Sequence, residues 1–242
     1  MDEALWDAIA KVERRHWWFR GRRELVANVL LQHVERGASV LDVGCGTGFV
    51  LERLAEHFDA WGCEPDPGVR ARATEGIRNR ILPGSTDNLV AARSRQYAAV
   101  MLLDVLEHLD DDVAALQQVR PVLEPGGVVL ITVPALPLLW TSHDDRNSHR
   151  RRYTRKSLSR VIAAAGMAPV TLSYVNARLF PLALAARLLS RVTGSRSNRE
   201  LAVPPAPLNR VFANLFAGEW RAVHRGYPIG LSLLAVVTEA RG

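Results

Sequence analysis

The residues best suited to chemistry in this chain begin near position 40, where an acidic side chain precedes a cluster of glycines. Asp42 is followed by three glycines at alternating positions: Gly44, Gly46 and Gly48. Glycine is required where the backbone takes angles that other residues avoid, and where a ligand must lie against the main chain. Glu64, twenty positions after Gly44, can accept hydrogen bonds from both hydroxyls of a ribose. The pattern predicts a site for a ligand that contains a nucleoside.

The spacing of the glycines separates two classes of nucleotide ligand. A dinucleotide fingerprint is G-x-G-x-x-G, and its third glycine would fall at Phe49. Here the third glycine comes one residue earlier, at Gly48. The shorter form suits a ligand without a pyrophosphate, so the spacing disfavours an NAD-dependent oxidoreductase. A glycine turn that binds no ligand is disfavoured by Glu64.

Apolar runs alternate with amphipathic segments through most of the chain, and these elements must position the glycines. The runs that indicate strands lie at 40–43, 60–63, 80–82, 98–103, 128–133, 169–174 and 231–237. Helical spacing is found at 50–57, 67–74, 113–123 and 154–165. Residues 4–34 indicate two helices with a break near Phe19–Gly21, the second ending at Gly37. The alternation predicts an α/β fold: a Rossmann-like, seven-stranded, mostly parallel sheet with helices on both faces.

We expect one domain over residues 1–242 with four parts. Residues 1–37 form an N-terminal helical cover, 38–177 the ligand-binding core, 178–226 an inserted helical cap and 227–242 the closing strand. The inserted cap has a polar turn at 194–198, a proline-rich link, a helix through Trp220, and an apolar helical stretch that contains Leu179, Leu182, Leu184, Leu188 and Leu189. This stretch is suited to wall an apolar substrate site, to rest on a membrane surface, or to form a core or dimer contact.

Composition narrows the classes of partner. The net charge is +6 and the pI about 10.0, and nearly all of the positive charge is arginine. The arginines are densest at 14–23 and 146–160, but acids interrupt them and no nucleic-acid-binding motif accompanies them. We therefore expect a solvated basic surface and no nucleic-acid partner, and leave open an anionic substrate.

The sequence also bears on the cellular compartment and on the redox state of the cysteines. The start of the chain is acidic, without the layout of a secretory signal, and no run approaches the roughly 18 apolar residues of a membrane span. These features predict a cytoplasmic enzyme, and they leave peripheral contact with a membrane open. We expect the enzyme to be a monomer or a homodimer. Cys45 and Cys63 fall at strand ends and are expected to be reduced thiols.

In combination, the motifs resemble the class I S-adenosylmethionine-dependent methyltransferases. The segment LDVLEHL at 103–109 resembles the end of the fourth strand in ubiquinone O-methyltransferase-like enzymes, and LEPGG at 123–127 resembles the turn into their fifth strand. The resemblance covers about residues 38–175. The flanking sequences at 13–23, 139–144 and 149–153 resemble a methyltransferase type 11-like bacterial subgroup whose substrates are mostly undefined.

This resemblance implies S-adenosylmethionine as the cofactor and S-adenosylhomocysteine as its product. The residues that it implies for the methionine end are Asp42, Gly44, Cys45, Gly46, Thr47 and Gly48. Glu64 and Pro65 would hold the ribose. Residues 104–108, Asp104 and Val105 in particular, would line the cofactor and the sulfonium side of the pocket. Ser85, Thr86 and Asp87 would border the adenine, although relatives often carry an acid where this chain has Ser85.

The acceptor is expected to be a small organic or lipid-like molecule, with oxygen favoured over nitrogen or carbon as the methylated atom. A non-methylating reaction on the same fold, such as a cyclisation, is an alternative. A binding protein with a vestigial pocket is a further alternative, which the intact Asp42, glycines and Glu64 disfavour.

The candidate catalytic residues are His108, His143, Asp144, His149 and Tyr153. We expect His108 or His143 to act as general base, oriented by Asp144 or Asp145. Alternatively, His108 caps the turn before the acidic run that follows it. Histidine and aspartate also bind metals, but their spacing matches no known ligand pattern, so no metal is expected.

The aromatic run Trp17-Trp18-Phe19 has two interpretations. It folds over the pocket as a lid, with Arg20, Arg22 and Arg23 facing an anionic substrate, or it anchors a helix to the domain.

Overall fold

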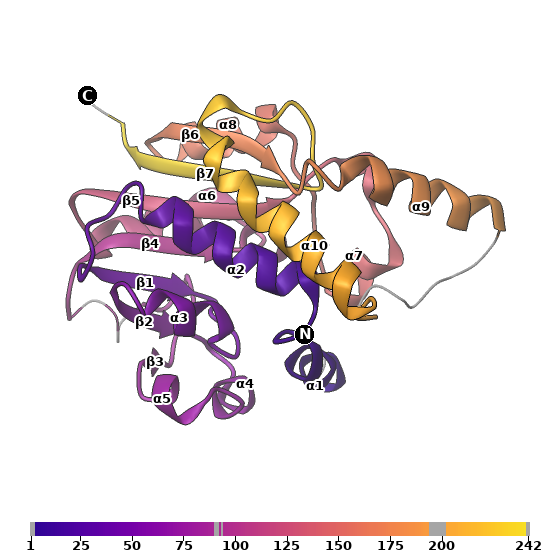
Figure 1. Ribbon diagram of the computed structural model, residues 1–242. Helices are drawn as coiled ribbons and strands as arrows, with labels where there is room; N and C mark the ends of the chain where they lie inside the picture. Colours follow the sequence, from indigo (N-terminus) through magenta and orange to yellow (C-terminus); the bar gives the residue numbers. More distant parts are fainter. Residues whose placement is uncertain (1–2, 90–91, 93, 194–201, 241–242) are drawn as a thin grey trace.

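The computed structural model describes residues 3–240 except 90, 91, 93 and 194–201. Its centre is a seven-stranded sheet in the order β3-β2-β1-β4-β5-β7-β6 (Figure 1). The strands are β1 Ser39–Val43, β2 Asp59–Cys63, β3 Ile81–Leu82, β4 Tyr97–Leu103, β5 Leu123–Pro134, β6 Met167–Val175 and β7 Ser232–Glu239. The neighbours from β3 to β5 are parallel, and β7 runs antiparallel to both β5 and β6. The predicted α/β class and the mostly parallel, seven-stranded sheet are confirmed.

Helices cover both faces of the sheet. The α-helices are α1 Glu3–Val12, α2 Trp17–Leu30, α3 Phe49–Leu54, α4 Pro67–Ala71, α5 Glu75–Arg78, α6 Asp112–Val119, α7 Ser142–Arg146, α8 Arg155–Ala164, α9 Phe180–Thr193 and α10 Ala206–Ala217. Helices α2, α3 and α10 supply buried side chains to one hydrophobic cluster, and α6 and α8 supply the other. Because both faces are covered, the central strands are apolar without alternation, which made them recognisable in the sequence.

The break between the first two helices lies earlier than the sequence indicated. We expected it near Phe19–Gly21, but α1 ends at Val12 and α2 begins at Trp17. His16 caps α2, because its side chain accepts a hydrogen bond from the Trp18 amide at 3.2 Å. Gly21 lies inside the helix, where a Cβ would come within 2.9 Å of the Phe216 ring on α10. The glycine serves close helix packing and is not a breaker.

The second helix also stops sooner than expected. It ends at Leu30, not at Gly37, and two turns of irregular chain lead into β1. Gly37 has a φ of +83° and donates its amide to the His57 carbonyl at 2.8 Å. It therefore makes the turn into β1 and does not end the helix.

The segment at 178–226 contributes two helices with different surroundings. Helix α10 runs along α2 (Figure 1), and buried Asn209 of α10 accepts a hydrogen bond from the Trp17 amide at 2.8 Å. Buried Glu219 accepts hydrogen bonds from the amides of Ala177 and Arg178. Helix α9 extends away from the sheet (Figure 1). The side chains of Leu188 and Leu189, and the predicted turn at 194–198, lie outside the described residues.

Unusual backbone angles gather where strands end. Three non-glycine residues with positive φ directly follow strands or lie one residue beyond them: Asp104 after β4, Leu136 after β5 and Asn176 after β6. Such angles cost free energy and recur at functional sites. The carboxyl edge of the sheet is thus the place to look for one. Elsewhere, Cys45 and Cys63 are free thiols, and no helix among the described residues is long and apolar enough to cross a bilayer.

Candidate functional site

The glycine loop leaves the carboxyl end of β1 in a conformation that only glycine adopts readily. Gly44, Gly46 and Gly48 have φ values of +77°, +57° and +78°. The amides of Gly44 and Cys45 both donate to the Cys63 carbonyl, which ties the loop to the end of β2. A Cβ on Gly44 would lie 2.8 Å from the Val105 side chain, so the predicted residues after β1 and β4 are in contact.

Two buried carboxylates flank this loop, as the sequence predicted. Asp42 is 2% exposed, and its Oδ1 has no hydrogen-bond partner. Burial raises its pKa to about 7, although Arg22 acts in the opposite direction. Glu64 accepts hydrogen bonds from the amides of Gly46 and Asp66, each at 3.1 Å, and burial raises its pKa above the ordinary value. Both carboxylates retain acceptor capacity next to a glycine-lined surface, which fits a ligand with an ammonium group and ribose hydroxyls.

The remaining predicted cofactor residues follow β2, β3 and β4. Pro65 is exposed behind Glu64. Ser85 pairs with Asn88 through their main chains in a turn, where Thr86 is buried and Asp87 is exposed. These positions all lie beyond the carboxyl ends of neighbouring parallel strands, where ligands of open α/β sheets bind.

An ion pair joins the N-terminal cover to the end of β4. Asp104, with a φ of +56°, pairs with Arg22 of α2 at 2.6 Å. Arg22 also lies over the Trp18 ring, 5.3 Å from its centroid. Arg22 therefore lies beside the acidic end of β4 and is paired with Asp104, so its predicted contact with an anionic substrate stays a prediction.

Helix α1 and the turn after it cover the glycine loop, through contacts that the sequence did not predict. The Trp6 ring would lie 3.1 Å from a Cβ on Gly46. The Thr47 hydroxyl donates to the Glu13 carboxylate, with oxygen–oxygen distances of 2.8 and 2.9 Å. No short-range signal marked these contacts, because they join residues 34 and 40 positions apart.

Within the aromatic run at 17–19, Trp17 supports the interpretation that the run anchors a helix to the domain. The Trp17 ring meets Phe212 and Phe216 of α10 edge-on, at centroid distances of 5.7 and 6.3 Å. Trp17 thus fixes α2 to α10. The cover over the glycine loop is α1 with the turn that follows it, through Trp6 of the helix and Glu13 of the turn.

Glu13 makes this cover sensitive to pH. Burial raises its pKa from 4.5 to about 7, against the lowering effects of the Thr47 hydrogen bond and of Arg14. Because the folded state holds this proton more tightly than the unfolded chain, stability should fall as pH rises between about 4.5 and 7. We expect Glu13→Gln, which keeps an acceptor for Thr47, to be more stable than wild type at pH 8 by about 1–3 kcal/mol and no more stable at pH 4.5.

The measurement is urea unfolding of both proteins across this pH range. Asp42, whose pKa is also raised, is present in both proteins. The free energy of unfolding of each should therefore keep the same remaining dependence on pH. A difference between the two curves that does not change with pH would contradict the prediction.

Three of the predicted catalytic residues meet beyond β4. His108 lies in the 3₁₀ turn η1, Leu106–His108, and its ring is 4.8 Å from that of His149. The His149 Nδ1 lies 2.9 Å from the Oδ1 of Asp144, which is fully buried. Arg150 fixes the two segments together, because its amide donates to the Glu107 carbonyl and its Nε to the His108 carbonyl.

The Asp144 carboxylate is the anchor of this loop. Arg152 binds both of its oxygens, at 2.7 and 3.0 Å, and the Thr141 amide donates at 2.8 Å. Although burial acts to raise its pKa, the hydrogen bonds from His149 and Arg152 hold that pKa well below the ordinary value. Asp144 is therefore an ionised positioning group.

Of the other two predicted catalytic residues, one lies outside this cluster. Tyr153 is 2% exposed in the core, and its hydroxyl donates to Asp112 at 2.7 Å. Burial and this bond raise the pKa of Tyr153, so its hydroxyl stays protonated near neutral pH and cannot accept a proton from an acceptor. The backbone of His143 lies in α7, but its side chain is outside the described residues. Glu107, which the resemblance placed in the segment 104–108 that lines the cofactor, is fully buried beside His108.

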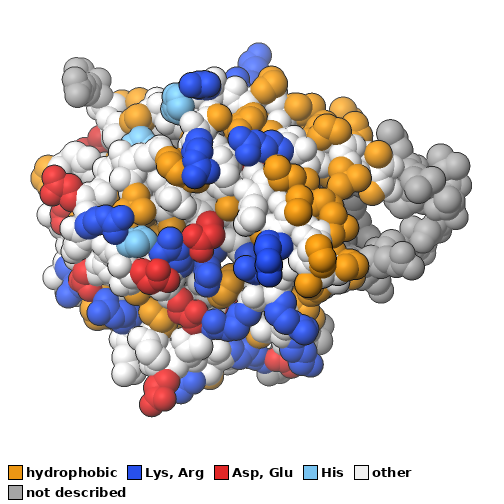
Figure 2. Space-filling model, viewed as in Figure 1, with side chains coloured by type: hydrophobic (Ala, Val, Ile, Leu, Met, Phe, Trp, Pro, Cys, Tyr) orange, Lys and Arg blue, Asp and Glu red, His pale blue; other side chains and the backbone are white. Residues whose placement is uncertain are grey.

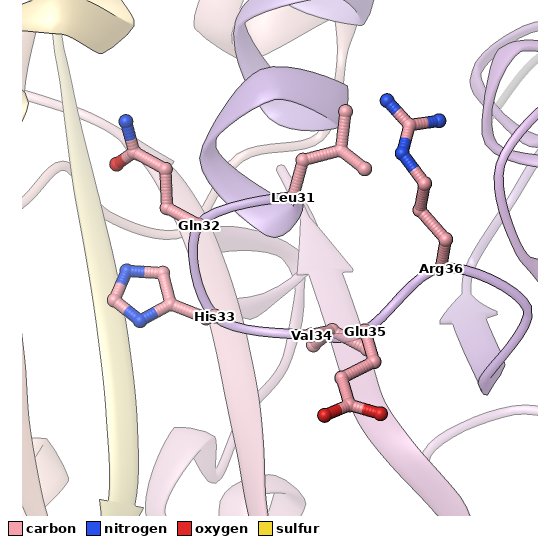
Figure 3. A pocket seen from close by; sticks show the side chains of 6 residues that line it. All are labelled: Leu31, Gln32, His33, Val34, Glu35 and Arg36. Carbon is pink, nitrogen blue, oxygen red and sulfur yellow. The ribbon is translucent and has the colours of Figure 1, made fainter.

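A surface hollow elsewhere lies at the turn between α2 and β1. Its lining residues are consecutive, from Leu31 to Arg36 (Figure 3). This turn leads into the amino end of β1, whereas the glycine loop leaves the carboxyl end. We therefore assign the hollow no part in the site.

Comparisons with known proteins show the family of the chain. A family model described as a methyltransferase domain matches residues 14–172. A ubiquinone biosynthesis O-methyltransferase of Azorhizobium caulinodans is 29% identical over 142 residues, which cover 52% of this chain and 56% of that protein. The chain thus spans about half the length of the curated relatives it matches.

Solved structures share the fold at low sequence identity. A complex between the Haloferax volcanii Trm112 methyltransferase activator and a methyltransferase matches with a TM-score of 0.61 and 18% identity, covering 99% of this chain and 96% of that one. The [4+2]-cyclase SpnF matches with a TM-score of 0.55 and 18% identity, covering 90% and 82%. At 18% sequence identity, these matches show a shared fold and no more.

Proposed function

This chain belongs to the methyltransferase domain family of class I S-adenosylmethionine-dependent enzymes, and we propose that it methylates a hydroxyl of a small or lipid-like acceptor. The observation that carries the proposal is the pair of buried carboxylates, Asp42 and Glu64, on either side of the glycine loop. Asp42 would hold the methionine end of the cofactor and Glu64 its ribose. Trp6 of α1 and Glu13 of the turn after it would shield the bound cofactor from water.

The cofactor supplies an activated methyl group on a positively charged sulfur. In the transfer, the acceptor oxygen forms a bond to the methyl carbon as the carbon–sulfur bond breaks, which leaves S-adenosylhomocysteine. The hydroxyl proton must pass to a base, and we assign this role to the cluster around His108. Burial lowers the pKa of His108, so its imidazole is neutral and able to take the proton near neutral pH. Oxygen as the methylated atom rests on the likeness to the ubiquinone biosynthesis O-methyltransferases.

An apolar surface supports a lipid-like acceptor and peripheral contact with a membrane. The exposed large apolar side chains include Leu138 and Trp140 after β5, Leu182 of α9, and Leu208 and Val211 of α10. In Figure 2, orange side chains gather over the part of the molecule where α9 and α10 lie, with basic side chains beside them. Such a surface suits an acceptor delivered from an anionic lipid surface.

Calorimetric titration with S-adenosylmethionine, S-adenosylhomocysteine and NADH tests the cofactor assignment. We expect micromolar binding of the first two, about −8 kcal/mol, and none of NADH. Binding of NADH alone would overturn the proposal in favour of an oxidoreductase. Tight S-adenosylmethionine binding without a methylated product, over a panel of hydroxylated acceptors and lipid extracts, would favour the non-methylating alternative.

A further inference from the structure

Helix α1 reaches from the glycine loop to the segment that follows β2. The Trp6 ring lies against Gly46, where a Cβ would come within 3.1 Å of it. Asp7, the next residue, accepts hydrogen bonds from the side chain of Arg72 at 2.6 and 2.9 Å, and Arg72 is the C-cap of α4. Glu64, whose carboxylate accepts the Gly46 amide, lies between these two attachments in the sequence. Helix α1 thus bridges the two segments that would hold the cofactor.

Trp6 covers the face of the loop that a glycine leaves open for a ligand. Gly46 has a φ of +57°, and its lack of a side chain lets a partner approach the main chain closely. Here that partner is the six-membered ring of the Trp6 indole. A cofactor held by the predicted residues would lie against the same surface. The indole must therefore move before the cofactor can enter.

The contacts that hold α1 in place are weaker than those that hold α2. None of the described side chains of α1, from Trp6 to Val12, belongs to either hydrophobic cluster. The ion pair between Asp7 and Arg72 is exposed, at 52% and 21% of the two side chains, and exposed pairs contribute little to stability. Helix α2, in contrast, buries six residues in the core. Helix α1 should therefore detach at a lower cost in free energy than α2.

The turn at 13–16 provides a hinge for α1. Glu13 of this turn accepts a hydrogen bond from the Thr47 hydroxyl, and Arg14 pairs with Glu52 of α3. These contacts fasten the turn to the glycine loop and to the helix that follows it. The turn can therefore stay attached to the domain while α1 lifts.

We propose that α1 is a gate for the cofactor, hinged at the turn 13–16 and latched by the ion pair between Asp7 and Arg72. The gate lifts Trp6 from Gly46 to admit S-adenosylmethionine, and it lifts again to release S-adenosylhomocysteine. This role rests on the proposed function, which makes that cofactor the ligand of the glycine loop. The rate at which α1 opens then limits how fast the cofactor exchanges.

Stopped-flow binding of S-adenosylmethionine, followed by tryptophan fluorescence, tests the gate. In wild type the observed rate should level off at high cofactor concentration, because the opening of α1 then limits association. Asp7→Asn breaks the latch and keeps the size of the side chain. The plateau and the dissociation rate of S-adenosylhomocysteine should each rise about two- to fivefold, as expected for one exposed ion pair. Glu239→Gln, which breaks an exposed pair with Arg120 at the opposite edge of the sheet, is the matched control and should leave both rates unchanged.

Amide hydrogen exchange of the cofactor-free protein measures the opening of α1 without a ligand. An isolated helix of ten residues is marginal in water, so α1 should lose its hydrogen bonds when it lifts. We expect its amides to exchange faster than those of α2, and Asp7→Asn to speed the exchange of α1 alone.

The two experiments separate the gate from the proposed function. Exchange in α1 as slow as in α2 would overturn the gate, and so would cofactor rates that are the same in wild type and Asp7→Asn. In either case, tight binding of S-adenosylmethionine would leave the proposed function intact. If α1 opens but neither S-adenosylmethionine nor S-adenosylhomocysteine binds, the proposed function fails, and α1 is a mobile cover but no gate for this cofactor.

Discussion

Asp144→Ala is expected to lower the free energy of unfolding by about 3–5 kcal/mol, the cost typical of removing one partner from a buried ion pair. The Asp144 side chain is 0% exposed and that of Arg152 is 5% exposed. The substitution would leave the Arg152 guanidinium buried without its counter-charge and His149 without its anchor. Equilibrium unfolding in urea would measure the loss.

The neighbouring acid provides a matched control. Asp145 is exposed and accepts one hydrogen bond, from the Trp140 indole at 2.9 Å. Asp145→Ala should therefore change stability by no more than about 1 kcal/mol. Equal losses in the two variants would mean that solvent, and not Asp144, balances the charge of Arg152.

A double variant separates the ion pair from the remaining contacts of Asp144. If the loss comes from the unpaired guanidinium, Asp144→Ala combined with Arg152→Ala should cost clearly less than the sum of the single substitutions. Additive losses would place the role of Asp144 in its bonds to Thr141 and His149 instead.

The strands of this fold could be predicted because each leaves a local signal. The buried parallel strands are apolar runs bounded by turn residues, and β1 was predicted to within one residue of its observed start at Ser39. The breaks between helices were harder. Gly21 has the local appearance of a helix breaker, but its small size is required by Phe216, which lies 195 positions away in the sequence.

The residues of the site show the same difference between local and long-range signals. Asp42 lies near the carboxyl end of β1, the glycines follow that strand, and Glu64 follows the adjacent β2, so their convergence at one edge follows from the topology. The bonds of Thr47 to Glu13 and of His149 to Asp144 depend on how a cover and a loop fold back, and no spacing rule encodes them. For the same reason, Tyr153 was grouped with the histidines in the sequence, although its hydroxyl is bonded to Asp112 in the core.

Glu64→Gln is expected to weaken S-adenosylmethionine binding by about 1.5–3 kcal/mol, roughly 10- to 150-fold, by calorimetry. The carboxylate accepts the amides of Gly46 and Asp66 and would also accept the ribose hydroxyls. The glutamine side chain presents an NH₂ group where an acceptor oxygen is needed. It would therefore lose a hydrogen bond either from one of the loop amides or from the ribose.

Asp59→Asn is the control, because Asp59 is a carboxylate at the amino end of β2, whereas Glu64 directly follows the carboxyl end of that strand. It binds Arg80 and Arg95 at the surface, away from the glycine loop, and its loss should leave cofactor affinity unchanged. Binding that is equally strong in wild type and Glu64→Gln would exclude ribose recognition by this carboxylate. The glycine loop and Asp42 would then have to hold the cofactor alone, which would leave Glu64 as a purely structural acceptor for the Gly46 and Asp66 amides.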